Sequence, residues 1–182
     1  AANNNELVAT LGNFIHRVLT ITFRNFGGEA PKPGQLEDAE NAALAACDTA
    51  LRDVAAAIEA RKFRDGLKAV MALAQHGNRY VDGKAPWVQV KSHREGAATT
   101  LWTALNIAAT LRTAMYPYLP FAAEKTHAML GFTGSVLQAG WKRGEIKPGA
   151  RRGEPAPLFK KLDVSIVEAE YARLGTVPAA KG

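Results

Sequence analysis

The stretch ELVATLGNFIHRVLTITFRNF, residues 6–26, decides the fold class of this chain. Its apolar residues recur at every third or fourth position, which is the spacing of one face of an α-helix. Asparagines at positions 3–5 can cap the start of this helix, and Gly27 with Gly28 can end it. The apolar stripe consists of Leu7, Leu11, Phe14, Ile15, Val18 and Ile21.

The same periodicity continues along the chain. Glu37, Asp38 and Glu40 would occupy the first turn of a second helix, where the helix dipole favours negative charge. Ser92 and Glu95 match a capping box at the start of a later helix. No segment alternates as a strand would. The sequence therefore predicts an all-α fold, a five-helix bundle, with helices over residues 6–26, 37–61, 63–80, 94–116 and 121–130.

The character of the sequence changes after Gly131. Residues 131–163 are rich in glycine, proline and basic residues, which predicts an irregular segment crossing the surface of the bundle. Asp163 can cap a short terminal helix that reaches about Arg173. We therefore divide the chain into a helical bundle over 1–131 and a C-terminal extension over 132–182 that packs on it.

Composition limits the function. The 182 residues carry a formal net charge of +6, which favours a polyanionic partner such as RNA or DNA. No apolar run is long enough to span a bilayer, and the N-terminus lacks the order of a signal peptide. The single cysteine, Cys47, excludes an internal disulfide and a cysteine-based zinc site, and it is expected to be a small buried side chain. These features indicate a cytoplasmic protein.

No catalytic constellation is visible. The four histidines share no metal-ligand spacing, and we expect each to be an ordinary surface or core residue. There is no glycine-rich phosphate-binding loop before a helix. The sequence therefore predicts neither a metal site nor a catalytic residue in this chain. The histidines are His16, His76, His93 and His127.

The first candidate binding site lies in LGNFIHR, residues 11–17. At about 100° per residue, Asn13 and Arg17 are one turn apart on the same helix face. Arg24 lies two turns further along that side, and all three are off the apolar stripe. An amide and a guanidinium one turn apart suit an unpaired base, and the guanidinium also suits phosphate. A solvated helix face would show the same spacing, so that alternative stays open.

The second candidate is Pro86-Trp87, in what we expect to be a polar turn over residues 81–91. A proline fixes the loop before the indole, and unpaired RNA bases commonly stack on aromatic rings. Lys84 and Lys91 flank the pair and suit phosphates. The alternative is a tryptophan that plugs the end of the bundle. For the other tryptophans, we expect Trp102 in the core and Trp141 as a lid over the bundle.

Together these features resemble the C-terminal anticodon-binding domain of methionyl-tRNA synthetases, a class I family. The resemblance covers nearly the whole chain and follows the family's order. Its motifs are fairly specific among class I synthetases. They are ELVATLGNFIHRVL at 6–19, NRYVDGKAPW at 78–87, LRTAMYPYLPFAAEKTHAMLG at 111–131 and PLFKKLD at 157–163.

The resemblance implies roles for individual residues. The asparagine and arginine of the family's first motif contact anticodon bases, and they match Asn13 and Arg17. The family's tryptophan after proline stacks on the first anticodon base, a cytosine in CAU, which implies this role for Trp87 with Pro86 as its support. Arg24 is inferred from helix geometry alone. The two residues that would buttress the site are Asn78 and Tyr80.

The resemblance also implies a function, a binding module within an enzyme. It would recognise the CAU anticodon of tRNA-Met so that a catalytic domain attaches methionine. The expected partners are tRNA-Met and that catalytic domain, with no membrane and no DNA. HIGH-type and KMSKS-type signatures are absent, so we expect an excised synthetase domain that is inactive alone. It would need no cofactor, since ATP and a candidate zinc ion would belong to the catalytic part. The alternatives are a stand-alone tRNA-binding factor and a protein-interaction module derived from a synthetase.

Overall fold

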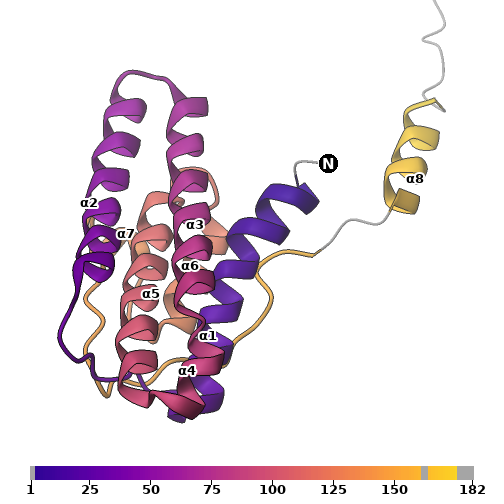
Figure 1. Cartoon of the computed structure of the whole chain (residues 1–182). Coiled ribbons are helices and arrows are strands. Elements are labelled where there is room, and N and C mark those ends of the chain that lie inside the picture. Colours follow the sequence, from indigo (N-terminus) through magenta and orange to yellow (C-terminus); the bar gives the residue numbers. More distant parts are fainter. Residues whose placement is uncertain (1–2, 161–163, 176–182) are drawn as a thin grey trace, which may run out of the picture.

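The computed structural model describes residues 3–160 and 164–175. Over these residues the chain is all-α, as predicted, and the β-pairing within them is one isolated bridge between Glu29 and Arg151. Figure 1 shows α2 and α3 side by side, joined at one end by a short loop. The short helix α4 and the C-terminal part of α1 lie at the opposite end.

The five helices expected from periodicity are all present, although some begin or end at other residues. They correspond to α1, α2, α3, α5 and α6. The segment η1 is π-helical and leads directly into α1. The elements are η1 (Asn3–Gly12), α1 (Asn13–Phe26), α2 (Asp38–Glu59), α3 (Phe63–Lys84), α4 (Pro86–Ser92), α5 (Arg94–Ala114), α6 (Pro120–Met129), α7 (Val136–Ala139) and α8 (Val164–Gly175).

The predicted turn over residues 81–91 is wrong. Helix α3 continues to Lys84, and α4 then occupies residues 86–92. Ala85 separates the two helices with a left-handed backbone (φ 45°), and its N–H donates to the Val81 carbonyl (2.9 Å). Pro86 then occupies the first position of α4, where its fixed φ favours a helix and its missing N–H costs nothing.

Two of the predicted helix caps are also wrong, although α5 begins at Arg94 as predicted. Ser92 ends α4 and its hydroxyl donates to the Val88 carbonyl (3.4 Å), so α5 begins after His93 without a side-chain cap. The asparagines at 3–5 lie within η1 rather than before it. A capping box does occur at Glu37 and Glu40, at the start of α2. The predicted cap at Asp163 lies outside the described residues.

Helix α5 forms the centre of the bundle and contacts α1, α2, α3, α4 and α6. Every residue from Ala97 to Ala114 is buried except Trp102, which is partly buried. The Trp102 indole packs against the core, as expected, and its N–H donates to the Ile146 carbonyl (2.9 Å). Cys47 is buried, also as expected, and its burial raises the pKa of the thiol.

Residues 131–160 run across the surface of the bundle, as the glycine and proline content indicates. The Ala30 N–H donates to the Ala150 carbonyl (2.9 Å), and the Arg152 N–H donates to the Gly28 carbonyl (2.7 Å). The indole N–H of Trp141 donates to the Leu51 carbonyl of α2 (3.2 Å). These bonds attach the segment to the bundle, while the boundary between 131 and 132 stays a prediction.

A glycine in α3 allows close approach of α1, which gives a testable prediction. A Cβ built on Gly77 would lie 2.6 Å from the buried ring of Phe14. We expect Gly77→Ala to lower the free energy of unfolding by up to about 2 kcal/mol, because overpacking outweighs the better helix propensity of alanine. Urea denaturation measures the change. Gly83→Ala is the matched control in the same helix, where a Cβ meets nothing within 4 Å; equal effects at the two positions would contradict the prediction.

Candidate nucleic-acid interface

Helix α1 presents its polar residues on the side away from the core. Phe14, Ile15 and Val18 are buried in the bundle, whereas Asn13 and Arg24 are exposed and Arg17 is partly buried. The spacing of one turn between Asn13 and Arg17 is therefore realised on an accessible face. This is the arrangement that recognition of an external ligand requires.

The indole of Trp87 lies beside this face. Its side chain is 38 % exposed, and the Arg17 Cζ lies 4.3 Å from the centroid of the ring. A guanidinium over an indole is attracted by the negative face of the ring. Pro86 is buried and anchors the first turn of α4. Trp87 is partly exposed and stands next to the polar face of α1.

Asp82 orients the guanidinium of Arg17 and was missed in the sequence reasoning. Asp82 lies in the last turn of α3, and its Oδ1 accepts a hydrogen bond from the Arg17 Nη1 (2.7 Å). Helices α1, α3 and α4 thus contribute Arg17, Asp82 and Trp87 to one cluster, which we call the Arg17–Trp87 cluster. The only available signal was the position of Asp82 inside the motif NRYVDGKAPW.

A buried carboxylate supports α3 and α2 just behind this cluster. Glu40 is 2 % exposed, and its Oε1 accepts hydrogen bonds from the Tyr80 hydroxyl (2.8 Å) and the Lys84 Nζ (2.9 Å). Burial alone would raise the pKa of Glu40, but hydrogen bonds from Lys84, Tyr80 and the Glu37 N–H hold it below its ordinary value. Burial and Glu40 raise the pKa of Tyr80, so its hydroxyl stays protonated and donates.

These contacts show what Tyr80, Lys84 and Asn78 do within the fold. Tyr80 and Lys84 hold α3 against α2 through Glu40, and Lys84 also lies 3.7 Å from Glu37. The Asn78 amide donates to the carbonyls of Thr10 and Ala74 (3.1 Å each), which ties η1 to α3. The contacts of Lys84 are with carboxylates, so its role as a phosphate contact stays a prediction.

Asn13 has different neighbours from Trp87. It lines a shallow cavity of about 180 Å³ together with His16, Leu158 and Phe159. Among the described residues, no hydrogen bond joins the Asn13 amide to Arg17 or Trp87. The structure therefore places Asn13 one turn along α1 from the Arg17–Trp87 cluster rather than within it.

Further basic residues flank the cluster at the ends of α1 and α4. Arg24 is exposed in the last turn of α1, and Lys91 is exposed in the last turn of α4. Arg94, which the sequence reasoning did not select, donates to the Asn25 carbonyl (2.7 Å) and lies 4.6 Å from the centroid of the Phe26 ring. The flank is cationic and suits a phosphate backbone.

Over residues 3–160 and 164–175, no group of three or more His, Cys, Asp or Glu side chains is placed to hold a metal ion. Within the same residues, no helix combines the length and the apolarity that crossing a bilayer requires.

Comparison with known families gives a consistent result. The family model described as the anticodon-binding domain of methionyl-tRNA ligase matches residues 30–177. The methionine–tRNA ligase of Roseiflexus sp. strain RS-1 is 40 % identical over 197 residues, covering 94 % of this chain and 33 % of the relative. The ligase of Dehalococcoides mccartyi is 39 % identical over 173 residues, covering 95 % of this chain and 31 % of the relative. The chain thus spans about a third of the length of these relatives.

Solved structures agree in fold. The free form of Mycobacterium tuberculosis methionyl-tRNA synthetase superposes with a TM-score of 0.83 and 27 % identity, over 89 % of this chain and 34 % of that protein. The same enzyme in complex with methionyl-adenylate gives a TM-score of 0.81 over 88 % of this chain.

Proposed function

This chain belongs to the family of anticodon-binding domains of methionyl-tRNA ligases, and from that premise we propose that it recognises the CAU anticodon of tRNA-Met. Recognition would serve a catalytic domain in the same ligase, which attaches methionine to the bound tRNA. The observation that carries the proposal is the Arg17–Trp87 cluster, because a partly exposed indole stands beside a guanidinium on an accessible face.

The cluster suits a single unpaired base. A base that leaves the anticodon stack can lie on the exposed part of the Trp87 ring, and this stacking is worth roughly 1–3 kcal/mol per base. Asp82 binds one end of the Arg17 guanidinium, which leaves N–H groups to donate to acceptors on a base edge. Pro86 and the buried Glu40–Tyr80–Lys84 contacts fix the helices that carry these groups.

Asn13 and the flanking cations would extend the interface. The Asn13 amide offers both a donor and an acceptor one turn along α1, so it can distinguish one base edge from another. Arg24 and Lys91 would contact backbone phosphates, which supplies affinity that depends on salt and not on sequence.

Replacing Asn13 by alanine tests the part of the proposal that concerns base identity. We expect Asn13→Ala to reduce the preference for a CAU stem-loop over stem-loops with altered anticodons by roughly tenfold, since a lost base contact is worth about 1–3 kcal/mol. Fluorescence anisotropy at a fixed salt concentration measures each affinity. Asn41→Ala, at an exposed asparagine of α2, is the matched control.

Equal losses for every stem-loop would identify Asn13 as a backbone contact instead. The same titrations separate the alternative functions. A protein-interaction module derived from a synthetase would show no anticodon preference even at low salt. A stand-alone factor would show the preference, but its gene would encode no catalytic domain.

The 182-residue chain by itself is expected to form no methionyl-adenylate. The sequence carries no HIGH-type or KMSKS-type signature, and these signatures mark the catalytic part of the family. An ATP–pyrophosphate exchange assay with methionine measures the activity directly. Exchange above the level of a protein-free control would show that the chain contains an adenylating site.

A further inference from the structure

A second basic site lies at the other end of α5. It is a cavity of about 600 Å³, lined by side chains of α5 and α6 and by the segment 131–152. Thr100 of α5 contacts Gln89 of α4, whereas Arg112 lies about 18 Å further along α5 at the rise of an α-helix. The cavity is therefore separate from the Arg17–Trp87 cluster. We call it the arginine pocket, with Arg112, His127, Phe132, Lys142, Lys147 and Arg152 in its walls.

Arg112 is buried without an ion-pair partner among the described residues. Its side chain is 1 % exposed, its Nε donates to the Ala109 carbonyl (3.2 Å), and its Cζ lies 4.8 Å from the centroid of the Phe132 ring. The charge of Glu124 acts on Arg112 electrostatically, while the Glu124 carboxylate accepts the Val136 N–H (3.0 Å). Across residues 3–160 and 164–175, no carboxylate oxygen lies within ion-pair distance of Arg112.

Arg152 is a second buried arginine, on another wall of the pocket. It is 9 % exposed, and its guanidinium donates to the carbonyls of Ala150 and Leu130. It too has no ion-pair partner in the described part of the chain. Burial lowers the pKa of both Arg112 and Arg152, yet a guanidinium remains charged at any physiological pH. The fold thus holds two buried cations that a bound anion would neutralise.

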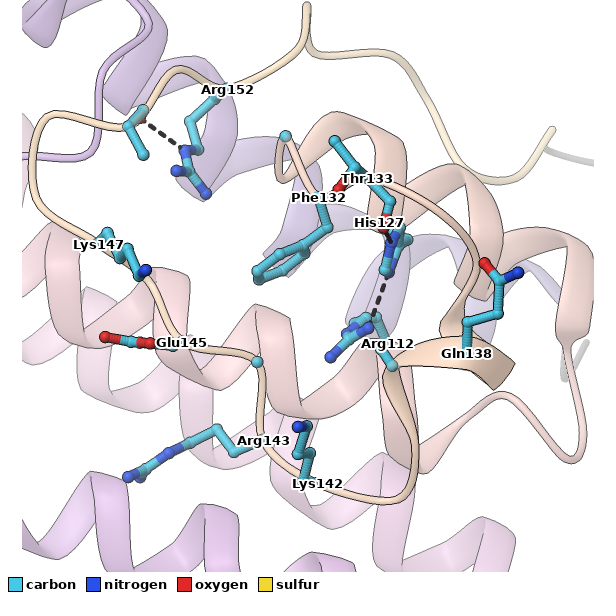
Figure 2. Close-up of a pocket in the computed structure, with 14 residues that line it drawn as sticks. Arg112, His127, Phe132, Thr133, Gln138, Lys142, Arg143, Glu145, Lys147 and Arg152 are labelled. Carbon is cyan, nitrogen blue, oxygen red and sulfur yellow. Dashed lines mark hydrogen bonds between the residues drawn. The ribbon is translucent and has the colours of Figure 1, made fainter.

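His127 fixes the direction of the Arg112 guanidinium. The Arg112 Nη1 lies 2.7 Å from the His127 Nδ1, and arginine can only donate, so Nδ1 must accept. The proton of the neutral ring is then on Nε2, which donates to the Thr133 carbonyl (3.2 Å). Figure 2 shows His127 and Arg112 joined in this way, with the Phe132 ring beside them. His127 is the satisfied core histidine that its sequence indicates.

The segment 142–147 forms the opposite wall. Lys142 and Lys147 are exposed at the rim, and Glu145 is the one carboxylate among the lining residues that are described. In Figure 2 the Arg143 side chain extends away toward α2, where it lies 3.9 Å from Asp48. Gly144 keeps this wall close, because a Cβ there would lie 2.9 Å from the Arg112 Nη2.

From these contacts we infer that the arginine pocket binds a phosphate group. Guanidinium groups bind phosphate through paired N–H donors, and the lysines at the rim add point charges. The volume lies in the range of pockets that hold small molecules, so a mononucleotide fits as well as free phosphate. A phosphate of an RNA backbone offers the same chemistry.

The first test uses the 182-residue chain with inorganic phosphate and pyrophosphate as probes. Phosphate is expected to raise the melting temperature in a saturable way, beyond the effect of sodium chloride at equal ionic strength. Lys142→Ala combined with Lys147→Ala is expected to weaken phosphate binding by roughly tenfold or more, measured by calorimetry. Lys62→Ala with Lys68→Ala is the matched control, since neither lysine lines the pocket.

Arg112→Met removes the buried charge while keeping most of the volume, and it should abolish the phosphate-induced rise in melting temperature. If that variant does not fold, the exposed lysine pair still decides the question. Absence of any rise beyond the salt effect would overturn the inference. Equal phosphate binding by the wild type and the lysine double variant would also overturn it.

Two further titrations identify the source of the phosphate. A mononucleotide site predicts that AMP binding depends on Lys142 and Lys147. A backbone contact predicts that full-length tRNA, but not a CAU stem-loop, binds the lysine double variant more weakly. If inorganic phosphate responds to the double variant and neither AMP nor tRNA does, the ligand is free phosphate. Trp87→Ala should leave phosphate binding unchanged, so the outcome is independent of the proposed anticodon function.

Discussion

Replacing Trp87 by alanine is expected to weaken binding of a CAU anticodon stem-loop by roughly 1–3 kcal/mol, which is about 5- to 150-fold in the dissociation constant. The indole is the only aromatic ring of the Arg17–Trp87 cluster, and Trp87 is 38 % exposed with the Arg17 guanidinium over its ring. Because the base stacks on a surface that the core does not need, helicity should be unchanged. Anisotropy titration gives the affinity, and circular dichroism gives the helicity.

The controls for this experiment use the same side-chain chemistry. Trp141 is 43 % exposed, and its indole N–H donates to the Leu51 carbonyl of α2. Trp141→Ala should therefore leave stem-loop binding intact. Trp87→Phe should retain much of the affinity, because stacking needs an aromatic face and not the indole N–H. Normal binding by Trp87→Ala would contradict the stacking role. Loss of helicity in Trp87→Ala would indicate that the Trp87 side chain stabilises the fold.

Replacing Glu40 by alanine should have the largest effect on stability, a loss of roughly 2–4 kcal/mol in the free energy of unfolding. The carboxylate is 2 % exposed and accepts hydrogen bonds from Tyr80, Lys84 and the Glu37 N–H. Removing it leaves the buried Tyr80 hydroxyl and the Lys84 ammonium without their acceptor. Urea denaturation measures the loss. Glu59→Ala, exposed at the other end of α2, should change stability by less than about 0.5 kcal/mol.

The same carboxylate predicts a dependence on pH. The pKa of Glu40 is lower in the folded chain than its ordinary value. A carboxyl group whose pKa is lower in the folded state contributes its full stabilisation above the pKa of the unfolded state, which is about 4.3 for glutamate. This stabilisation is lost as the pH falls through the pKa of the folded state. The difference in stability between wild type and Glu40→Ala should therefore shrink below about pH 4. A difference that stayed constant down to the lowest pH would contradict this role.

Much of the fold could be predicted because it depends on local periodicity. The stripe from Leu11 to Val18 and the small residues of α5 specify helices that bury one face or all faces. Helix α4 could not be predicted in this way. It has only seven residues, and a left-handed Ala85 is needed before it, a conformation that few alanines adopt.

The candidate site was predictable only in part. The one-turn spacing of Asn13 and Arg17 follows from helix geometry. The contact of Arg17 with Trp87 joins residues on two helices, and no spacing rule gives it. Lys84 was predicted as a phosphate contact, and in the fold its Nζ lies 2.9 Å from the buried Glu40 carboxylate of α2. Arg112 is the one charged residue of α5 after Glu95, and this signal was not used in the sequence reasoning. A buried arginine requires a partner.

The left-handed Ala85 affects how much entropy a ligand would lose on binding at Trp87. A non-glycine residue in this conformation costs of the order of 1 kcal/mol, and it persists because Val81 and Pro86 lock it from both sides. The backbone that leads into Trp87 is therefore fixed while the chain folds. A ligand that meets the ring finds this backbone already ordered, so little backbone entropy is lost on association. The cost of the Ala85 conformation is thus met during folding and is not added to the free energy of binding.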